Sequence, residues 1–242
     1  MCGDIQMRLD KFLSETGTCT RSEASKAARS GGITVNGVPV KRADVHIDPE
    51  KDAVSLSGVP VRYKRFTYIM LNKPDGYISA TEDSRGERTV LELLDERARR
   101  LGLFPCGRLD KNTLGLLLLT NDGDLCHDLL SPKKHVSKVY RFRSERVITD
   151  EDKARLESGV TLDGEMTKPA KLTLDEGRRS GTIEITEGRF HQIKRMLEVV
   201  CNKIEYLERV EFAGMPLDAS LERGDWRELT PDEEKKLLLL KK

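Results

Sequence analysis

Asp110 is the residue of this sequence that is best placed to do chemistry. It follows Gly107-Arg108-Leu109 and precedes a short, wholly apolar run at 115–119, which closes at the turn sequence Asn121-Asp122-Gly123. Such a run predicts a strand buried on both faces, although a short buried helix has the same composition. A carboxylate on a polar turn beside a rigid element suits nucleophilic or acid–base chemistry. An aspartate in this local setting is more often a turn residue that bonds its own backbone.

Tyr140 lies in a second segment of interest, Ser137–Arg143, in which side chains of different character alternate. The alternation predicts a strand whose two faces carry Val139, Arg141 and Arg143 on one side and Lys138, Tyr140 and Phe142 on the other. A tyrosine on a strand face packs into a core or lines a pocket, and the segment alone leaves both open.

A third segment, 189–197, has helical spacing. We expect Phe190, Ile193 and Leu197 to point inward. His191, Lys194 and Arg195 then fall at positions i, i+3 and i+4, which groups them on one face. This face either is simply solvated or contributes cations to a site.

The elements that must position these residues begin with a small N-terminal unit. A helix is expected from Met7 to Ser14, and a capping box of Thr20 and Glu23 starts a second, basic helix at 21–30. Asn36-Gly37 between two apolar triplets predicts a tight hairpin, and a further strand is expected at 53–56. Two short helices and a few strands in about sixty residues predict an independent module, residues 7–60, near the lower size limit for stability.

The rest of the chain predicts a second, larger domain. The turn-rich and basic stretch 58–66 indicates a linker, placed at 61–66, and the second domain is then 67–242. Strands and helices follow each other in irregular order, which predicts an α+β fold with a mixed or antiparallel sheet. Strands are expected at 68–73, 137–143, 172–174, 181–186, 210–212 and 226–229, with the last two closing the sheet, and helices at 89–101, 124–130, 150–159 and 231–240.

Composition narrows the class of protein. The 242 residues carry a net charge of +1, with 37% apolar and 34% charged side chains, which is typical of a soluble globular protein. We find no apolar run near the eighteen or so residues of a membrane span, and residues 1–6 lack the apolar region of a secretory signal. The dispersed cysteines 2, 19, 106, 126 and 201 form no metal or redox pair, which predicts reduced thiols in a cytoplasmic protein.

Three N-terminal motifs resemble the alpha-L RNA-binding motif of a small-subunit ribosomal protein and of many RNA-modifying enzymes. They are 8–13, Thr20-Arg21-Ser22-Glu23-Ala24 and Gly32-Ile33-Thr34-Val35-Asn36-Gly37. The basic helix face would contact phosphates without reading bases, and a solvated helix surface is the alternative. The RNA-contacting residues expected here are Arg8, Lys11, Arg21, Lys26 and Arg29.

Four motifs of the second domain, in order, resemble a bacterial-type pseudouridine synthase of the small-subunit ribosomal RNA family. They are 71–74, 107–123, 138–140 and 187–196. With the N-terminal module, the resemblance covers nearly the whole chain. It implies an alpha-L domain followed by a catalytic domain with a mixed, largely antiparallel sheet flanked by helices. It also implies that a specific uridine in ribosomal RNA is isomerised to pseudouridine.

The resemblance implies a role for each site residue. Asp110 is the essential carboxylate, whether it attacks the ribose, attacks the base or removes a proton. Tyr140 packs against the target base, and Lys194 pairs with Asp110, which favours the charged carboxylate. Lys replaces the Arg of more distant synthases and cannot form a bidentate fork. Arg108 fills the space left by the flipped uridine.

Arg189 and His191 are expected to contact RNA or to act structurally. The resemblance implies no metal and no organic cofactor. The expected partner is ribosomal RNA or an assembly particle, with no membrane, for a monomeric cytoplasmic enzyme. Large-subunit RNA is the alternative target, and a non-catalytic assembly factor the alternative function. A glycoside hydrolase is disfavoured, because no second carboxylate accompanies Asp110.

Overall fold

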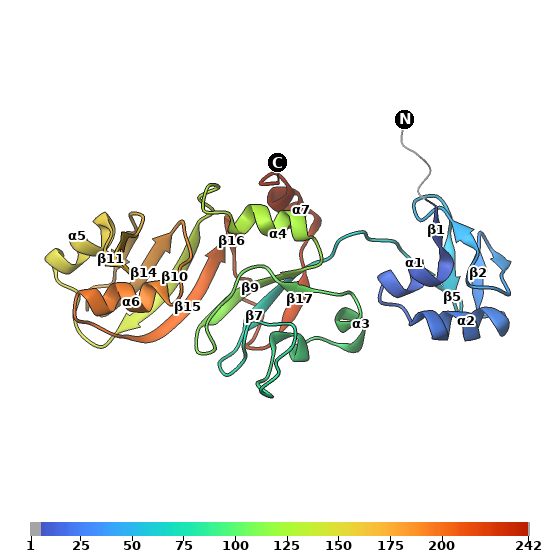
Figure 1. Ribbon diagram of the computed structural model, residues 1–242, viewed down its shortest axis with the longest axis horizontal. Helices are drawn as coiled ribbons and strands as arrows, with labels where there is room; N and C mark the ends of the chain where they lie inside the picture. The colour runs from blue at the N-terminus through green and yellow to red at the C-terminus, as the bar shows by residue number, and fades with distance from the viewer. Residues whose placement is uncertain (1–5, 242) are drawn as a thin grey trace. The chain divides into compact units, whose positions relative to one another are not determined.

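The computed structural model describes residues 6–241, which form two compact units (Figure 1). The first unit is Met1–Thr67, described from residue 6, together with Leu94–Leu103. The second unit is Tyr68–Leu93 and Phe104–Lys242. Cys2 and most of the N-terminal stretch that bears on a secretory signal lie outside the described residues.

The first unit packs two helices against short strands. α1 (Leu9–Glu15) follows β1 (Met7–Arg8), which pairs with β4 (His46–Ile47). The capping box predicted for α2 (Arg21–Arg29) is confirmed: the Thr20 side chain accepts from the Glu23 amide, and the Glu23 side chain accepts from the Thr20 amide. A four-stranded sheet has the order β3 (Val38–Pro39), β2 (Ile33–Val35), β5 (Val54–Leu56) and β6 (Val59–Val61). The core of the unit includes Leu9, Phe12, Leu13, Ala24, Ala28 and Ile33.

Two hairpins shape this sheet. The predicted turn at Asn36-Gly37 is confirmed, with φ of 52° and 79°, the left-handed values that a two-residue hairpin needs. Ser57-Gly58 forms a turn of the same kind, with φ of 51° and 79°. The interpretation of 58–66 as linker was therefore wrong for Val59–Val61, which pair with β5. The serine before the glycine hid the turn, because a serine tolerates positive φ less readily than asparagine does.

The second unit is built on one large sheet. In the described part of the chain it has nine strands, and its main path is β13 (Lys171–Leu174), β14 (Ser180–Ile185), β10 (Lys138–Ser144), β15 (Ile204–Phe212), β9 (Leu114–Thr120), β7 (Tyr68–Lys73) and β17 (Trp226–Glu228). Two short strands join it, β8 (Phe104–Pro105) on β9 and β16 (Met215–Pro216) on β15. β9 and β15 run parallel and the other described pairs of this sheet antiparallel. The mixed, largely antiparallel sheet is thus confirmed.

The centre of the sheet holds the strand that anchors Asp110. Leu116–Leu119 of β9 are fully buried, as predicted for a strand covered on both faces, and each buried leucine stabilises the fold by about 1.5–3 kcal/mol. β15 lies beside it and is longer and more central than the closing strand expected at 210–212. Its charged residues Glu205, Glu208 and Arg209 masked the apolar signal of a central strand.

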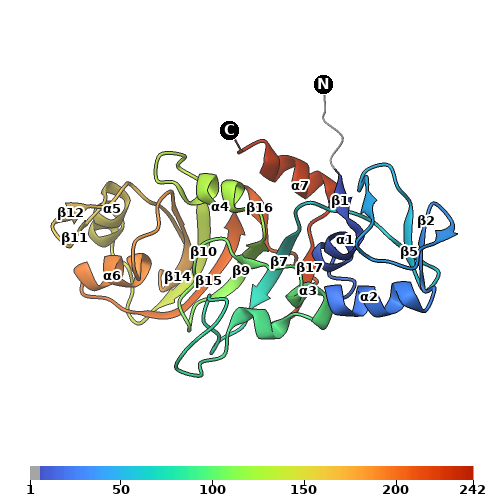
Figure 2. The same cartoon turned by 45° about the vertical axis from the view of Figure 1, so that its right-hand side comes forward.

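Helices cover the sheet and its ends. In the views of Figures 1 and 2, α5 (Asp150–Ser158) and α6 (Gln192–Val199) lie together at the β14 end, and α7 (Pro231–Leu238) lies beside α4 (Gly123–Leu130).

The helix expected at 89–101 is broken into a 3-10 turn, Val90–Leu93, and α3 (Glu96–Arg99). Asp95 causes the break, because its side chain accepts from the Ala98 amide as the cap of a new helix.

None of the helices described between residues 6 and 241 has the length and apolar character needed to cross a bilayer.

Candidate active site

A pocket of about 640 Å³ lies on one face of the large sheet. Its floor comes from three adjacent strands, because the residue pairs Lys138–Ile185 and Tyr140–Arg209 stand opposite each other in the β10–β14 and β10–β15 registers. One wall is the loop that carries Asp110, and the other is the segment that leads into α6. The floor residues are Ile185 of β14, Lys138 and Tyr140 of β10, and Leu207 and Arg209 of β15.

The Asp110 loop, between β8 and β9, is held by hydrogen bonds on both sides. The Thr113 amide donates to the Asp110 carbonyl at 3.0 Å, which closes the turn. Just before it, the Ser79 hydroxyl donates to the Leu109 carbonyl at 2.8 Å and accepts from the Leu109 amide at 3.0 Å. Asp110 therefore lies in a turn, and its carboxylate faces the pocket, where Thr113 Oγ1 lies 3.5 Å from Oδ2.

Lys73 connects the same loop to the end of β7 by hydrogen bonds. Its fully buried ammonium donates to the carbonyls of Pro74, Lys111 and Thr113 at 3.1, 3.0 and 2.9 Å. Burial lowers the pKa of Lys73 from 10.5 to about 8. Three carbonyl acceptors offset the cost of burying this group, so the Asn72-Lys73-Pro74 motif serves to fix the loop.

Gly115 brings this loop close to β15. Its φ is +95°, and a Cβ there would run into the backbone of Arg209 on the parallel strand. Only glycine combines this backbone conformation with such a close approach. The start of β9, and with it the Asp110 loop, therefore packs directly against the strand that forms the pocket floor.

The opposite wall is set by a tight turn before α6. The helix begins at Gln192, so the expectation of helix from Arg189 onward was wrong for its first three residues. The buried Gln192 side chain donates to Glu187 at 2.8 Å and accepts from the Arg189 amide at 2.9 Å. His191 has φ 50° and ψ 33°, in the left-handed region that few non-glycine residues adopt.

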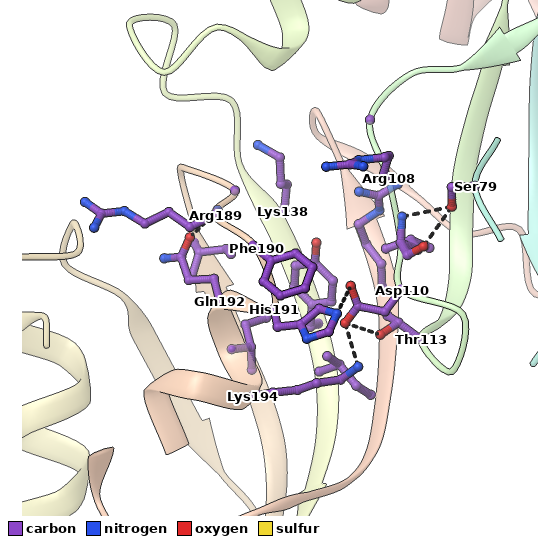
Figure 3. Close-up of a pocket in the computed structure, with 18 of the residues that line it drawn as sticks. Ser79, Arg108, Asp110, Thr113, Lys138, Arg189, Phe190, His191, Gln192 and Lys194 are labelled. Carbon is purple, nitrogen blue, oxygen red and sulfur yellow. Dashed lines mark hydrogen bonds and ion pairs between the residues drawn. The ribbon is translucent and has the colours of Figure 1, made fainter. Parts of the chain in front are cut away.

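His191 and Lys194 meet Asp110 across the pocket (Figure 3). Lys194 Nζ lies 2.5 Å from Asp110 Oδ2 and 2.6 Å from Asn112 Oδ1, and His191 Nε2 lies 3.5 Å from Asp110 Oδ1. The Asp110 side chain remains 26% exposed. The arrangement is a reachable carboxylate with a fixed cation against one oxygen, which fits nucleophilic or acid–base chemistry.

The other expected site residues lie in different surroundings. Tyr140 is 7% exposed on the pocket floor. Arg108 is exposed and lines the pocket on the Asp110 side (Figure 3). The Arg189 guanidinium points away from Asp110 and donates to the carbonyls of Glu165 and Met166 at 3.1 and 2.7 Å.

One expectation for the side chains of this segment was wrong. Phe190 does not point inward but is 69% exposed, because the tight turn at His191 interrupts the helical spacing. The Arg195 guanidinium binds Asp163 at 2.5 Å. Asp163 belongs to the hairpin of β11 (Thr161–Leu162) and β12 (Glu165–Met166), which the sequence interpretation missed.

In the first unit, the expected RNA-contacting cations divide into two groups. Arg21, Lys26 and Arg29 are exposed on α2. Arg8 is paired with Asp10 at 2.6 Å, and Lys11 with Glu15 at 3.5 Å. The α2 group is therefore the more available to phosphates.

Sequence reasoning did not place Lys138 and Arg209 in the site. Lys138 is 7% exposed and donates to the Val136 carbonyl at 2.9 Å; Arg209 is 2% exposed and donates to the Leu116 carbonyl. Both cations lie over the Phe212 ring, at 5.7 and 4.8 Å from its centroid. The two-residue period of the strand puts Lys138 on the same face as Tyr140, so it could have revealed Lys138 as a site residue. The place of Arg209 in the site depends on a long-range strand pairing, which has no local signal.

The buried Lys138 gives a pH-dependent prediction. Burial lowers the pKa of Lys138 from 10.5 to about 8, so between these values the unfolded chain binds more protons, and stability rises with pH. From about pH 7 to about pH 9.5, wild type should gain about 2 kcal/mol relative to Lys138→Met. Urea unfolding of both proteins across this range measures the difference. Parallel pH profiles would contradict the prediction.

Within residues 6–241, no three His, Cys, Asp or Glu side chains gather closely enough to hold a metal ion.

Known proteins resemble this chain over nearly its whole length. Residues 67–199 match the model of the RNA pseudouridylate synthase family, and residues 7–53 match the S4 domain. A protein of Bacillus subtilis described as an uncharacterised RNA pseudouridine synthase is 46% identical over 231 residues, which cover 94% of this chain and 96% of the relative. Ribosomal small subunit pseudouridine synthase A of Yersinia pestis is 39% identical over 94% of this chain and 96% of its own.

A relative named for the large ribosomal subunit and a solved structure are also similar to this chain. Ribosomal large subunit pseudouridine synthase B of Bacillus subtilis is 36% identical over 96% of both chains. A crystal structure of a pseudouridylate synthase superposes with a TM-score of 0.67 at 37% identity, covering 96% of this chain and 99% of the other. The two sequence resemblances are thus confirmed, and the chain, an S4 domain followed by a catalytic domain, belongs to the RNA pseudouridylate synthase family.

Proposed function

We propose that this protein isomerises a uridine of small-subunit ribosomal RNA to pseudouridine in the Asp110 pocket. The observation that carries the proposal is the reachable Asp110 carboxylate with Lys194 Nζ at 2.5 Å, in a chain of this family. The relative from Yersinia pestis, named for the small subunit, supports this target. The relative named for the large subunit is similar at nearly the same identity, so large-subunit RNA is the competing target.

The reaction itself needs few groups. The bond from ribose C1′ to uracil N1 breaks and a bond from C1′ to C5 forms; C5 loses its hydrogen and N1 gains a proton. Asp110 supplies the carboxylate on which the reaction depends, and Lys194 fixes its orientation. Such positioning of a reactive group can account for several kcal/mol of the barrier. The proposal requires no metal and no organic cofactor.

The target uridine must leave its stack to reach this carboxylate. Tyr140, on the pocket floor, is placed to pack against the uracil ring. Arg108, exposed on the pocket rim, is placed to fill the space that the uridine leaves in the RNA. His191 makes a second polar contact with Asp110, and the exposed part of its ring can contact RNA.

The proposed domain division is an RNA-binding domain at 7–60, a linker at 61–66 and a catalytic domain at 67–242. The family matches at 7–53 and 67–199 support it. In this scheme α2 binds phosphates through Arg21, Lys26 and Arg29. Arg8 and Lys11 contribute less to phosphate binding, because each is paired with an acidic neighbour. Arg189 acts mainly by holding the 161–166 hairpin. We place the protein in the cytoplasm as a monomer that acts on ribosomal RNA or an assembling particle.

The proposed role of α2 predicts a change in salt dependence. Arg21→Ala combined with Arg29→Ala should weaken RNA binding and reduce the slope of log affinity against log salt by about 2, since each lost phosphate contact removes about 0.9. The turnover number at saturating RNA should stay within about twofold of wild type, because both residues lie outside the pocket. Filter binding at several salt concentrations measures the slope.

The control for this prediction is Arg42→Ala in the same unit. Arg42 is exposed but paired with Asp44 at 2.6 Å, so its removal should leave the slope unchanged. An unchanged slope in the double variant, or an equal loss in the control, would argue against a phosphate-binding face on α2.

The target is tested by hydrogen release from C5. Small-subunit and large-subunit transcripts labelled with tritium at uridine C5 are incubated with the protein, each as naked RNA and as partly assembled particles. One equivalent of tritium released from small-subunit RNA alone is the expected result. Release from large-subunit RNA alone would make large-subunit RNA the target. No release of tritium from any substrate would refute the proposed activity.

A further inference from the structure

Phe190 is a large aromatic side chain that is mostly exposed at the edge of the pocket. It is 69% exposed, although it lines the pocket that holds Asp110. One face of its ring covers the His191 ring, with centroids 3.8 Å apart and planes at 19° (Figure 3). A phenylalanine in water forgoes the free energy of burial, and the ring of Phe190 offers an exposed aromatic surface to a ligand beside Asp110.

The chain on both sides of Phe190 is held by polar contacts. The residue before it donates its amide to the buried Gln192, and the Arg189 guanidinium is bound by two carbonyls of the β11–β12 hairpin. The residue after it, His191, contacts Asp110. A stacking surface held in this way binds a planar ligand with little loss of conformational freedom.

The target uracil is not the ligand of this ring. It must reach Asp110 and lie against the floor of the pocket, where Tyr140 is 7% exposed. Phe190 is mostly outside, so a base on its open face stays at the rim. The pocket and the rim can therefore hold two different bases at once.

The chemistry of the rim favours a nucleobase over another apolar group. Arg108 lines the same pocket, and its exposed guanidinium provides donors and a positive charge for an adjoining phosphate. Bases stack readily on aromatic side chains, and such stacking tolerates any sequence because every base has a π face. When a uridine flips out, its neighbour loses a stacking partner, and an aromatic surface nearby offsets that loss.

We propose that Phe190, stacked on His191, is the platform for the base that adjoins the target uridine when the target occupies the pocket. The inference rests on the proposed function and adds a second base-binding position to it. Phe190 is then a substrate-positioning residue that acts on binding and leaves the chemical step unaffected.

The first test compares variants at the rim, using an RNA oligonucleotide that spans the modified uridine. Phe190→Ala should raise KM about tenfold while kcat stays within about twofold, since base–aromatic stacking has this magnitude. Phe190→Trp should retain the wild-type KM, and Phe190→Leu, which is apolar but not aromatic, should behave like Phe190→Ala. Met166→Ala is the matched control, because Met166 is 62% exposed on the neighbouring hairpin and lines no part of the pocket.

The second test locates the base. Oligonucleotides carry an abasic residue directly 5′ or directly 3′ of the target. For wild type, one of these should raise KM about tenfold, and the same change should have no further effect in Phe190→Ala. An unchanged KM in Phe190→Ala, or an abasic penalty of equal size in both proteins, would overturn the inference. Wild-type protein that forms no pseudouridine in either ribosomal RNA, naked or in assembling particles, would instead refute the proposed function, and the platform with it.

Discussion

Asp110→Asn is expected to abolish pseudouridine formation while RNA affinity stays within a few-fold of wild type. The amide keeps the shape of the side chain and can still accept from Lys194 Nζ, which now lies 2.5 Å from Oδ2. It lacks the negative charge that makes the carboxylate a nucleophile or a base. Loss of such a group costs about 10³-fold or more in turnover. Single-turnover kinetics and filter binding on the same RNA measure the two quantities.

The binding half of this prediction follows from charge. The negative charge of Asp110 repels phosphates, so its neutralisation removes no attraction to RNA. Asp150→Asn is the matched control, because Asp150 is an exposed carboxylate paired with Arg178 and lies outside the pocket. It should keep full activity. An Asp110→Asn protein with a tenth or more of wild-type turnover would exclude Asp110 from the proposed role.

Lys194→Met is expected to lower kcat about a hundredfold with little change in KM. The ammonium binds both Asp110 Oδ2 and Asn112 Oδ1, so it fixes the carboxylate relative to its own loop. Without it, the carboxylate can turn by about an ångström, and misplacement of that size costs about 10²-fold. Lys194→Arg keeps the charge but changes the geometry of the contact, so it should recover part of the activity.

A matched control separates this effect from general loss of charge. Lys203 is exposed and lines no part of the pocket, so Lys203→Met should retain wild-type kcat. If Lys194→Met instead raised KM and left kcat unchanged, Lys194 would bind RNA and would not position Asp110.

The features that could be predicted from the sequence are those with short-range causes. The buried strand β9, the Thr20–Glu23 capping box and the Asn36-Gly37 hairpin each depend on residues within a few positions of one another. The two faces of β10 also follow from local alternation, which put Tyr140 on one face with Lys138 and Phe142; the structure shows that this face is buried. The Asp163-Gly164 hairpin had an equally local signal, an Asp-Gly pair at positive φ, and was overlooked.

The features that could not be predicted depend on contacts between distant segments. β15 reads as a charged stretch, and only its pairing with β9 and β10 makes it central. That pairing brings Arg209 under the pocket. Phe190 was assigned to the buried face of a helix, because the spacing alone does not reveal the turn at His191, which Gln192 and Glu187 hold in place. Arg189 was expected to meet RNA or act structurally, and its partners on β12 became visible only in the fold.

The measurement that tests the central claim most directly is carbodiimide mapping of pseudouridine in both ribosomal RNAs after incubation with wild type or Asp110→Asn. The account predicts one new reverse-transcription stop in small-subunit RNA, present with wild type and absent with the variant. The same stop in both samples would contradict the role of Asp110. No stop on any RNA, with tight binding retained, would contradict catalysis itself and favour a non-catalytic assembly factor.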